Sequence, residues 1–480
     1  MMQVRSFDLA VLGAGPAGAS AAISARRHGL SVAVIDEASR AGGQVYRAPS
    51  YTASLAQMQE NPDLVSGEKL RDDLASSGAQ LLFGHKLWFA APGIKLSTVS
   101  TAGPFWFDAR AFVIATGTTE RIIPVPGGTL PGVIGLAAAT ILLKAHAAVP
   151  QGPTVVAGVG PLLYAVAAGI LKAGGKVAAV VDLARPGDWA TRLSGLLSRP
   201  DLLRRGALWM WKLRAAGVPI RFGHAVTAIE GDEQVCAVRI APVDRDWRVL
   251  PGTRTETLAA ASVCIGHGLV PATETARLLG VPHHYRAERG GFVPEVAEDR
   301  STCVAGVYIA GDCAGISGAA AAGHAGTLAG LAAARDLGAL ARGAFEEATS
   351  PVRHALSRAE RFGWSISALM ALRSGLTMTM PPETVVCRCE DITRAKIVSA
   401  ARTGAMDVNQ LKSTTRCGMG PCQGRMCAEA AAELIAMTSA GSRDAAGQWT
   451  ARSPLRPLPV TALVGTYSYD DIPRPPPLPG

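Results

Sequence analysis

Five cysteines near the C-terminus are the side chains of this chain best suited to chemistry. They stand as Cys387-Arg-Cys389, then Cys417 and Cys422, then Cys427, whereas the other four cysteines are scattered singly through the first 313 residues. Thiolates grouped as C-x-C and C-x4-C, with a stretch between them that can fold back, suit a four-coordinate zinc or iron–sulfur site. The segment therefore predicts a metal centre, against the alternative of an apolar cysteine cluster that binds no metal.

A metal centre of this kind needs four thiolates, so one of the five cysteines is spare. The pairs Cys417/Cys422 and Cys422/Cys427 have the same spacing, which leaves the choice open. We predict Cys387, Cys389, Cys422 and Cys427 as the ligands and Cys417 as the spare residue, with Cys427 as the alternative spare. Four thiolates suit either zinc or a [2Fe–2S] cluster.

The N-terminus carries a second candidate site, a glycine turn suited to a dinucleotide. Gly13, Gly15 and Gly18 follow the strand-like run 7–12 and open an Ala-rich helical stretch. Gly13 permits the tight turn, Gly15 lets the backbone approach a pyrophosphate, and Gly18 lets the helix pack closely on the strand. Free N–H groups and the dipole at the helix N-terminus favour phosphate at this point.

The remaining contacts to a dinucleotide are predicted from strand ends and loops. Asp36 stands 23 residues after Gly13, at the end of the second strand, and should bind a ribose hydroxyl pair, with Glu37 as the alternative. The other predicted contacts are Pro16 and Ala17 in the turn, Gly43, Gln44 and Arg47 in a loop, Ala115, Thr116 and Gly117 at a strand end, and Gly311 and Asp312 at another. The strand, helix and acid at this spacing disfavour a purely structural turn.

A second glycine motif, Gly158-Val-Gly-Pro-Leu-Leu163, departs from the dinucleotide pattern. Leucine stands where the third glycine is required, which pushes helix and strand apart and gives a pyrophosphate a poor fit. Asp182 follows 24 residues after Gly158, so ribose binding stays open, and Arg185 is the nearest cation for a 2′-phosphate. We predict a second nucleotide-binding fold, and its use of NAD(P)H is the less favoured alternative.

The bulk composition limits the class of protein. The chain has 480 residues, 48% of them hydrophobic, which suggests roughly three domains. A net charge of +9 is modest over this length, and no basic stripe with interleaved aromatics indicates a nucleic-acid binder. We expect neither a secretory signal nor a transmembrane segment. Nine unevenly spread cysteines do not suggest a disulfide framework, so we expect a cytoplasmic location, peripheral to a membrane only through partners.

These patterns predict an α/β protein with two nested Rossmann-like domains and a small α-rich cysteine domain. We divide the chain into a first fold at 1–125 and 255–340, a second fold at 126–254, a helical linker at 341–383, the cysteine domain at 384–437 and a proline-rich arm at 438–480. A helical insert at 186–215 carries three tryptophans and a row of arginines. We interpret its aromatics as core or as a partner surface, and its arginines as a solvated face.

Two histidines lie in glycine-rich turns near the predicted dinucleotide. We interpret His267 and His324 as packed or hydrogen-bonded side chains, and we predict no catalytic acid or base in this chain. The segment before residue 384 also contains no C-x-x-C pair. The dithiol of a thioredoxin or glutathione reductase is therefore missing.

The ordered set of motifs resembles a known family. Gly13-Ala-Gly-Pro-Ala-Gly18, Gly42-Gly-Gln-Val-Tyr-Arg47 and Gly311-Asp-Cys-Ala-Gly315 resemble the disulfide-reductase-like flavoproteins with two dinucleotide folds. The variant with G-x-G-P-L-L and a C-terminal cysteine domain is similar to the α subunits of opine oxidases, hydrogen cyanide synthases and D-hydroxyproline or proline dehydrogenases. Residues 387–427 resemble the [2Fe–2S] module of bacterioferritin-associated ferredoxin, with two extra residues inside its second cysteine pair.

The resemblance implies an electron-transfer flavoprotein that works in a complex. It implies FAD in the first fold, with ATP in its place in some relatives, and a [2Fe–2S] cluster on Cys387, Cys389, Cys422 and Cys427. A β subunit of the glycine- or sarcosine-oxidase type would oxidise an amine or imino acid, in some members with an FMN at the subunit interface and a small γ subunit. Electrons would leave to a downstream acceptor. The alternatives are a self-contained NAD(P)H-dependent flavin oxidoreductase and a nucleotide-binding scaffold with structural zinc.

Overall fold

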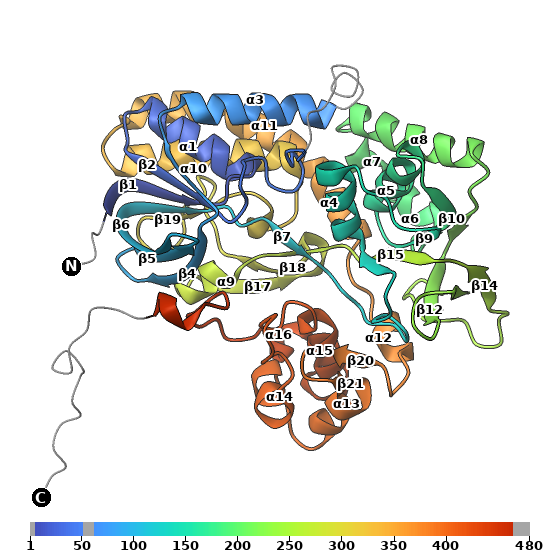
Figure 1. The fold of residues 1–480 in the computed structure, drawn as a ribbon. Coiled ribbons are helices and arrows are strands. Elements are labelled where there is room, and N and C mark those ends of the chain that lie inside the picture. The colour runs from blue at the N-terminus through green and yellow to red at the C-terminus, as the bar shows by residue number, and fades with distance from the viewer. Residues whose placement is uncertain (1–4, 51–61, 464–480) are drawn as a thin grey trace, which may run out of the picture.

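A seven-stranded sheet organises the N-terminal part of the protein (Figure 1). The structure is a computed structural model and describes residues 5–50 and 62–463. The strands are β1 (Arg5–Leu12), β2 (Val32–Asp36), β3 (Gln80–Phe83), β4 (Lys86–Ala91), β5 (Lys95–Ser100), β6 (Gly103–Ile114) and β19 (Val307–Ile309), in the order β3-β2-β1-β6-β5-β4 with β19 also beside β6. β3, β2, β1, β6 and β19 run parallel, so their carboxyl ends meet at one edge.

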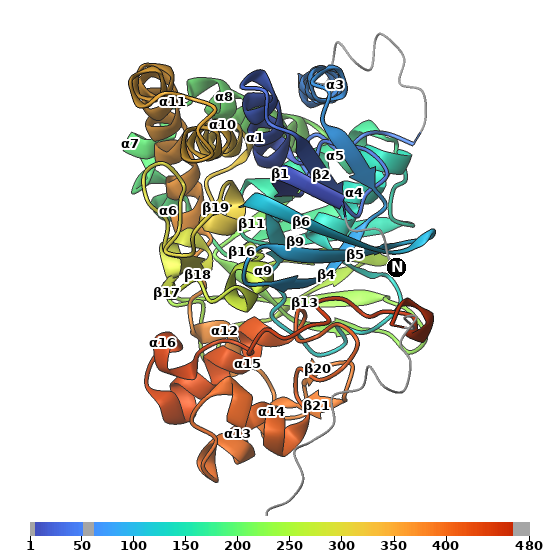
Figure 2. The ribbon, with the colours of Figure 1, turned by 90° about the vertical axis from the view of Figure 1, so that its left-hand side faces the viewer.

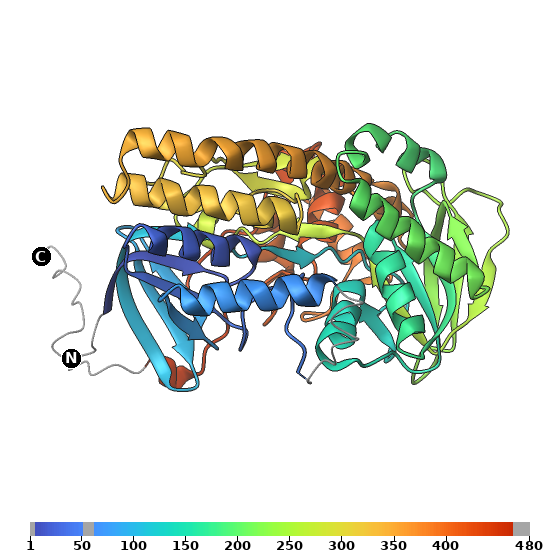
Figure 3. The ribbon, with the colours of Figure 1, turned by 90° about the horizontal axis from the view of Figure 1, so that it is seen from above.

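Four helices cover one face of this sheet and lie side by side (Figure 3). They are α1 (Pro16–Arg27), α3 (Pro62–Ser76), α10 (Ala319–Asp336) and α11 (Arg342–Leu369). A Cβ atom on Gly326 would overlap the carbonyl of Ala17, and one on Gly330 would press on that of Ala21. Two glycines four residues apart therefore let α10 touch the backbone of α1, which brings the α1 N-terminus against the β19 strand end.

A second, five-stranded parallel sheet forms the other nucleotide-type fold. Its strands are β8 (Val133–Gly135), β9 (Pro153–Gly158), β10 (Lys176–Asp182), β11 (Ile220–Phe222) and β15 (Ser262–Gly266), in the order β11-β10-β9-β15-β8. The helices α4 (Leu136–His146), α5 (Pro161–Lys172), α6 (Pro186–Ala190), α7 (Leu193–Leu196) and α8 (Pro200–Ala215) accompany it, with a meander of β12 (His224–Glu230), β13 (Ala237–Pro242) and β14 (Glu256–Ala259).

One domain boundary differs from our division of the sequence. We assign residues from 255 onward to the first fold, but β14 and β15 belong to the second fold in the structure. The physical reason is that β15 pairs in parallel with both β9 and β8 and so completes the second sheet before the chain returns. The two crossings between the folds are β7 (Thr118–Glu120) and β16 (Leu269–Pro271), which pair antiparallel.

The long helix α11 connects both folds. Phe345 and Leu356 pack in the core below α10, while Leu369 and Met370 at its carboxyl end reach the core of the second fold beside Trp247. The segment 341–383, which we expect as a linker, is thus largely a helix buried along one side. In the described part of the chain, neither α11 nor any other helix has the length and apolar composition needed to span a bilayer.

The cysteine domain is a small helical unit below the first fold (Figure 2). It comprises β20 (Val385–Cys387), β21 (Ile392–Thr393), α13 (Arg394–Arg402), α14 (Val408–Thr415), α15 (Ala428–Ile435), the π-turn η3 (Ala436–Ala440) and α16 (Arg443–Ala446), and α12 (Gly375–Thr379) leads into it. Ile397, Leu411 and Ile435 form its core together with the sulfurs of Cys417 and Cys427. The cysteines are therefore part of the interior of this domain.

The C-terminal arm folds back onto the first sheet. After α16 the chain runs extended, and the backbone N–H of Leu455 donates to the carbonyl of Trp88 on β4 at 2.9 Å. Leu455 is buried in the core on that side of the sheet. The arm thus ties the cysteine domain to the first fold up to η4 (Val460–Ala462). The last part of the expected proline-rich arm, residues 464–480, lies outside the described residues.

We expect Gly326→Ala to destabilise the first fold, because the new methyl group overlaps the α1 backbone. The cost should be about 1–3 kcal/mol of unfolding free energy, as for overpacked cores. Gly323→Ala on the same helix is the control, since its Cβ would meet only the Ser20 hydroxyl at 3.6 Å, and it should be neutral or stabilise by up to about 1 kcal/mol. Chemical unfolding followed by circular dichroism measures both, and equal stability of the two variants would contradict this packing.

Candidate functional site

The predicted dinucleotide contacts of the first fold come together at one sheet edge. β1, β2, β6 and β19 end there, and they are followed by the glycine turn at 13–18, by Asp36 and Glu37, by 115–117 and by Gly311 and Asp312. The loop carrying Gly43, Gln44 and Arg47 reaches the same edge, because Gly43 lies against Gly15. Segments up to 300 residues apart in sequence thus surround the start of α1.

The glycine turn itself has no room for side chains. A Cβ on Gly13, whose φ is +99°, would overlap the carbonyl oxygen of Ala115, and one on Gly18 would overlap that of Gly13. Gly15 caps α1, and among the described residues no side chain bonds to the first N–H groups of this helix. The turn therefore presents uncapped N–H groups behind a surface of bare backbone, which fits the pyrophosphate of a dinucleotide.

Asp36 holds the glycine turn in place. Its Oδ2 accepts a hydrogen bond from the Ala14 N–H at 2.6 Å, and its Oδ1 accepts one from the Ala38 N–H at 2.7 Å. Burial raises the pKa of Asp36, although both N–H groups oppose that rise. Each carboxylate oxygen keeps one more acceptor position, so the side chain can still receive ribose hydroxyls. Glu37 is exposed and lies 4.0 Å from Arg456 of the C-terminal arm.

The other predicted dinucleotide contacts lie in different surroundings: a buried turn, a strand end and an exposed loop. Oδ1 of Asp312 accepts the N–H groups of Ser317 and Gly318 at 2.8 Å each, which holds the turn before α10, and burial raises the pKa of Asp312. Thr116 donates from its hydroxyl to the Ala272 carbonyl at 2.7 Å. In the exposed loop, Arg47 donates to Gln44 Oε1 at 2.9 Å.

The second fold uses its ribose-position carboxylate internally. Asp182 is fully buried, and its two oxygens accept hydrogen bonds from the Tyr164 hydroxyl at 2.6 Å and the Ala184 N–H at 2.9 Å. Burial raises the pKa of Asp182 to about 7. Arg185 is also engaged, because its guanidinium donates to the Val243 carbonyl. Because Asp182 is 0% exposed, a ribose cannot reach its remaining acceptor positions, and the Arg185 guanidinium is already hydrogen-bonded.

The glycine turn of this fold is filled as well. A Cβ on Gly160 would overlap the sulfur of Met370, which reaches the turn from the end of α11. Met370 packs there with Val159, Trp247 and Leu369. Leu163, at the position of the third glycine, is fully buried in the core between α5 and the sheet. A dinucleotide would have to displace this packing before it could bind.

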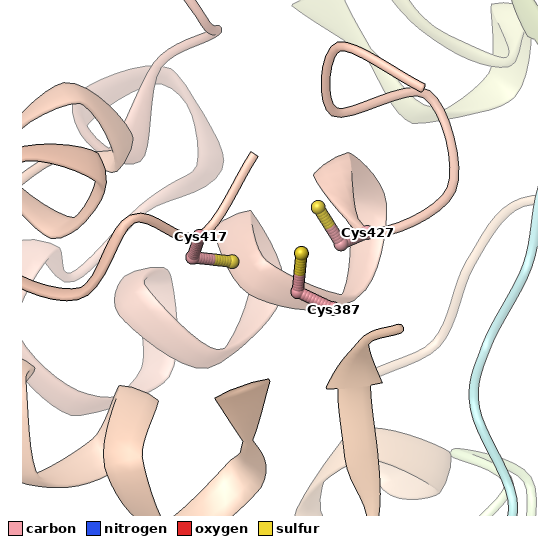
Figure 4. Close-up of side chains that lie close together, drawn as sticks. All are labelled: Cys387, Cys417 and Cys427. Atoms are coloured by element: carbon pink, nitrogen blue, oxygen red, sulfur yellow. The ribbon is translucent and has the colours of Figure 1, made fainter. Parts of the chain in front are cut away.

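Three cysteine thiols of the C-terminal domain point into one small space (Figure 4). The sulfurs of Cys387, Cys417 and Cys427 all lie within 4.8 Å of one another, and the three residues are at most 1% exposed. The first cause of the raised pKa of Cys387 is its hydrogen bond with the Cys427 thiol, followed by burial. Such crowding of buried thiols fits a thiolate-ligated metal, which would replace the protons.

The other two cysteines complete the group on its outer side. Cys389 and Cys422 are partly exposed, and the Cys389 sulfur bonds to both the backbone N–H and the thiol of Cys422. Backbone N–H groups of Gly418 and Glu390 bond to the Cys387 sulfur. The five cysteines thus form an inner group of three and an outer pair, and Cys417, which we predict as spare, lies within 4.8 Å of both Cys387 and Cys427. Our choice of ligands stays a prediction.

An indole ring covers the cysteine loop, which the sequence did not reveal. Trp449, on the arm after α16, is 8% exposed, and its ring lies where a Cβ on Gly418 or Gly424 would be. Both glycines have positive φ, +86° and +82°. The glycines among the cysteines indicated that a neighbouring group packs closely on the loop. The residues near them in sequence did not indicate that this group is Trp449.

A buried ion pair joins the cysteine domain to the two folds. Arg121 is 1% exposed and donates to the carbonyls of Met370 at 2.9 Å and Gly290 at 2.7 Å. Its Nε lies 3.2 Å from Oε2 of Glu429, which follows the cysteine loop on α15. Although burial opposes its charge, Arg443 and Arg121 hold the pKa of Glu429 below its usual value. The pairing spans 308 positions, so sequence reasoning could not find it.

A pocket of about 370 Å³ lies beside this junction. Its lining comes from three parts of the chain: Arg277 of the first fold, Lys412 and Gln423 of the cysteine domain, and Trp449 and Arg452 of the arm. The pocket adjoins the cysteine loop at Gly418 and Gly424. Its cations suit an anionic group.

The two singled-out histidines take structural roles. His267 is 5% exposed, and its Nδ1 accepts the Ile123 N–H at 3.4 Å. Burial, and after it the charge of Arg121, lower the pKa of His267 to about 4. Burial likewise lowers the pKa of His324. Both rings are thus neutral at pH 7.

Comparison with known proteins agrees with this layout. A family model described as pyridine nucleotide-disulphide oxidoreductase matches residues 7–334, and one described as a BFD-like [2Fe–2S] binding domain matches residues 385–437. The A subunit of opine oxidase from Agrobacterium tumefaciens is 36% identical over 95% of this chain and 91% of its own length. The HcnB subunit of hydrogen cyanide synthase from Pseudomonas aeruginosa is 31% identical over 94% of this chain and 97% of its own.

Solved structures show the same fold. The L-proline dehydrogenase from P. horikoshii superimposes with a TM-score of 0.68 at 19% identity, covering 97% of this chain and 81% of that one. A thioredoxin reductase from T. acidophilum covers 69% of this chain with a TM-score of 0.51 at 22% identity. The second likeness is confined to the two nucleotide-type folds by its length.

We expect Glu429→Gln to loosen the cysteine domain from the first fold, because Arg121 and Arg443 would lose a buried counter-charge. Breaking a buried pair in this way costs about 3–5 kcal/mol. Glu230→Gln removes the exposed partner of Arg239 and is the matched control, with an expected change below about 1 kcal/mol. Denaturant unfolding followed by visible absorbance of the metal centre measures both, and indistinguishable midpoints would exclude a role for the buried pair.

Proposed function

The chain belongs to the pyridine nucleotide-disulphide oxidoreductase family, and on this premise we propose that it is the electron-transferring FAD and [2Fe–2S] subunit of a heteromeric dehydrogenase. A partner subunit oxidises an amine or imino acid, of the opine, glycine or hydroxyproline type, and passes the electrons to this chain. The relatives from opine oxidase and hydrogen cyanide synthase are themselves named as subunits of those enzymes, which supports a role within a complex.

One observation carries the proposal: the chain fills its own second nucleotide fold. Asp182 is bonded to Tyr164 and Ala184, and Met370 occupies the glycine turn. At Gly15 of the first fold, in contrast, an added Cβ would meet only the Cα of Gly43, at 3.6 Å, among the described residues. A protein with a flavin site and a metal centre, but with its NAD(P)H position closed, must receive electrons from another source. A partner that oxidises substrate supplies that source.

The residues divide the work between two cofactors. The glycine turn and the α1 N-terminus bind the pyrophosphate of FAD, Asp36 receives its ribose, and Asp312 orients the turn next to the flavin polyol. When bound, the flavin accepts electrons in pairs or singly and the cluster carries them one at a time. The protein's part is to position the two groups and to keep water from the inner cysteines.

We assign the cluster ligands as Cys387 and Cys427 on the inner side and Cys389 and Cys422 on the outer side. Cys427 is in hydrogen-bond contact with both Cys387 and Cys417, and it stands at the N-terminus of α15, where the helix dipole favours a thiolate. Cys389 and Cys422 contact each other directly. Cys417 then remains a buried thiol behind the cluster.

The finer identity of the complex follows the family resemblance. We assign the substrate site to a β subunit of the glycine- or sarcosine-oxidase type, and a small γ subunit is a further component. An FMN at the interface, as in some members, would find cations for its phosphate in the pocket beside the cysteine loop, at Lys412 and Arg452. From the cluster the electrons pass to a downstream acceptor.

We expect NADH to leave the flavin of the anaerobically purified chain oxidised, and dithionite to bleach both the flavin and the cluster. The reason is that Asp182 and the glycine turn, which would receive NADH in the second fold, are already engaged. Visible absorbance during titration measures both steps. Bleaching of the flavin by NADH within the mixing time would replace the proposal with a self-contained NAD(P)H oxidoreductase.

Leu163→Gly provides a sharper version of this test. The substitution restores the third glycine of the motif but leaves Asp182 and Met370 in place. We therefore expect no gain of NADH reduction, together with a loss of about 2–5 kcal/mol in stability from the cavity. A large gain of NADH affinity would show that the leucine alone closes the site.

We expect Cys389→Ser to lose most of its iron and the cluster absorbance, whereas Cys417→Ser retains both. The serine at 389 removes a ligand of the outer iron, but the one at 417 changes only a neighbour of the cluster. Iron content per chain and electron paramagnetic resonance of the reduced protein measure the outcome. A colourless Cys417→Ser beside an intact Cys427→Ser would reverse the assignment of the spare cysteine.

A further inference from the structure

The two outer helices of the second fold expose an unusual set of side chains. Leu193 and Leu197, on and just after α7, are 47% and 57% exposed, and Leu208 and Trp211 on α8 are 47% and 65% exposed. Among the residues that the structure describes, no other aromatic side chain reaches the exposure of Trp211. We call these four residues, with the exposed cations around them, the α7–α8 face.

The opposite side of α8 already has its packing partners. Leu213 is fully buried, and Trp209 and Met210 pack against the core between α5 and the second sheet. Trp189, the third tryptophan of the segment, packs into the same core. Our interpretation of the aromatics therefore divides: Trp189 and Trp209 pack against the core, while Trp211 is 65% exposed.

The charge of the α7–α8 face is positive. Arg192, Arg204, Lys212 and Arg214 are exposed, and within the described ranges none of them pairs with a carboxylate. The two acids of the segment are both neutralised, since Asp188 pairs with Arg373 and Asp201 pairs with Arg199. Four exposed cations thus surround a row of apolar side chains.

We infer that the α7–α8 face is a docking surface for an anionic phospholipid bilayer, on which α8 lies in the plane of the interface. Its tryptophan and leucines would enter the boundary between headgroups and acyl chains, while the long cations reach the phosphates beside them. An amphipathic helix with these two faces has the composition of an interfacial anchor. Attraction to anionic lipid adds a contribution from each exposed cation.

The position of the face in the molecule agrees with this role. In Figures 1 and 2 the helices α7 and α8 lie in the upper part of the molecule, and the cysteine domain lies at the bottom. Binding here leaves the cysteine loop and the pocket beside it open to partners. A protein partner is the alternative occupant, and the experiments below distinguish it from a bilayer.

Vesicle flotation of the full chain tests the inference. We expect wild type to float with vesicles of phosphatidylcholine and phosphatidylglycerol, and to do so about ten-fold less with phosphatidylcholine alone. Raising the salt to about 0.5 M should weaken binding, because it screens the cations. Failure of wild type to float with the anionic vesicles would overturn the inference.

Two variants and a matched control locate the binding. Leu208→Ser with Trp211→Ser, and separately Arg204→Glu with Arg214→Glu, should each reduce flotation by about ten-fold. Met378→Ser with Met406→Ser alters apolar residues that are 42% and 50% exposed, on α12 and in the cysteine domain, and should float as wild type does. Visible absorbance of the cofactors and circular dichroism confirm that each variant is folded.

The outcomes separate the two occupants. Unchanged flotation of both α7–α8 variants would overturn the inference even if wild type binds vesicles. Absence of vesicle binding, together with loss of a stoichiometric partner subunit from the same variants, would also overturn it and make the face an interface with that partner. Loss of flotation in the two variants alone, with the control unaffected, supports the membrane surface.

Discussion

One guanidinium holds the parts of this protein together. Arg121 donates to carbonyls of His267 and Met370, where the second fold and α11 end, and to that of Gly290 in the first fold. Its remaining side faces Glu429 of the cysteine domain. A charge buried to this degree is tolerated only if all its hydrogen bonds are satisfied. The hydrogen bonds of this one side chain therefore connect four segments, one from each of its partners.

Glycine and methionine decide which of the two nucleotide folds stays open. In the first fold, the glycines of α10 let its backbone touch that of α1, and among the described residues only Gly43 borders Gly15 of the turn. In the second fold, the chain uses the same kind of turn as a packing site, because the end of α11 delivers Met370 to it. The two nucleotide-type folds thus differ because α11, which covers the first sheet, ends at the glycine turn of the second fold.

The cysteine domain combines a rigid interior with an accessible outer edge. Three thiols are in the core, while Cys389 and Cys422 reach the surface side of the loop. The arm closes the loop with Trp449 and continues to β4 through Leu455. An electron carrier needs this arrangement, because shielding stabilises the cluster and a thin outer edge keeps it within reach of a partner.

The sequence alone determined the local features of this protein. Glycine and cysteine spacing, strand runs and an acid at the right distance depend on neighbours within about 30 positions, so the first fold, the cofactor edge and the metal domain could be predicted from them. The tertiary structure decided the rest: the hydrogen bond of Asp182 with Tyr164, the filling of the turn by Met370, the pairing of Arg121 with Glu429 and the meeting of three buried thiols. Most of these depend on contacts between residues remote in the chain, and even the closest of them, between Asp182 and Tyr164, depends on how a helix packs on its sheet. The type of a residue shows that its side chain can form a hydrogen bond or an ion pair, but only the packing of the folded chain shows which partner it has.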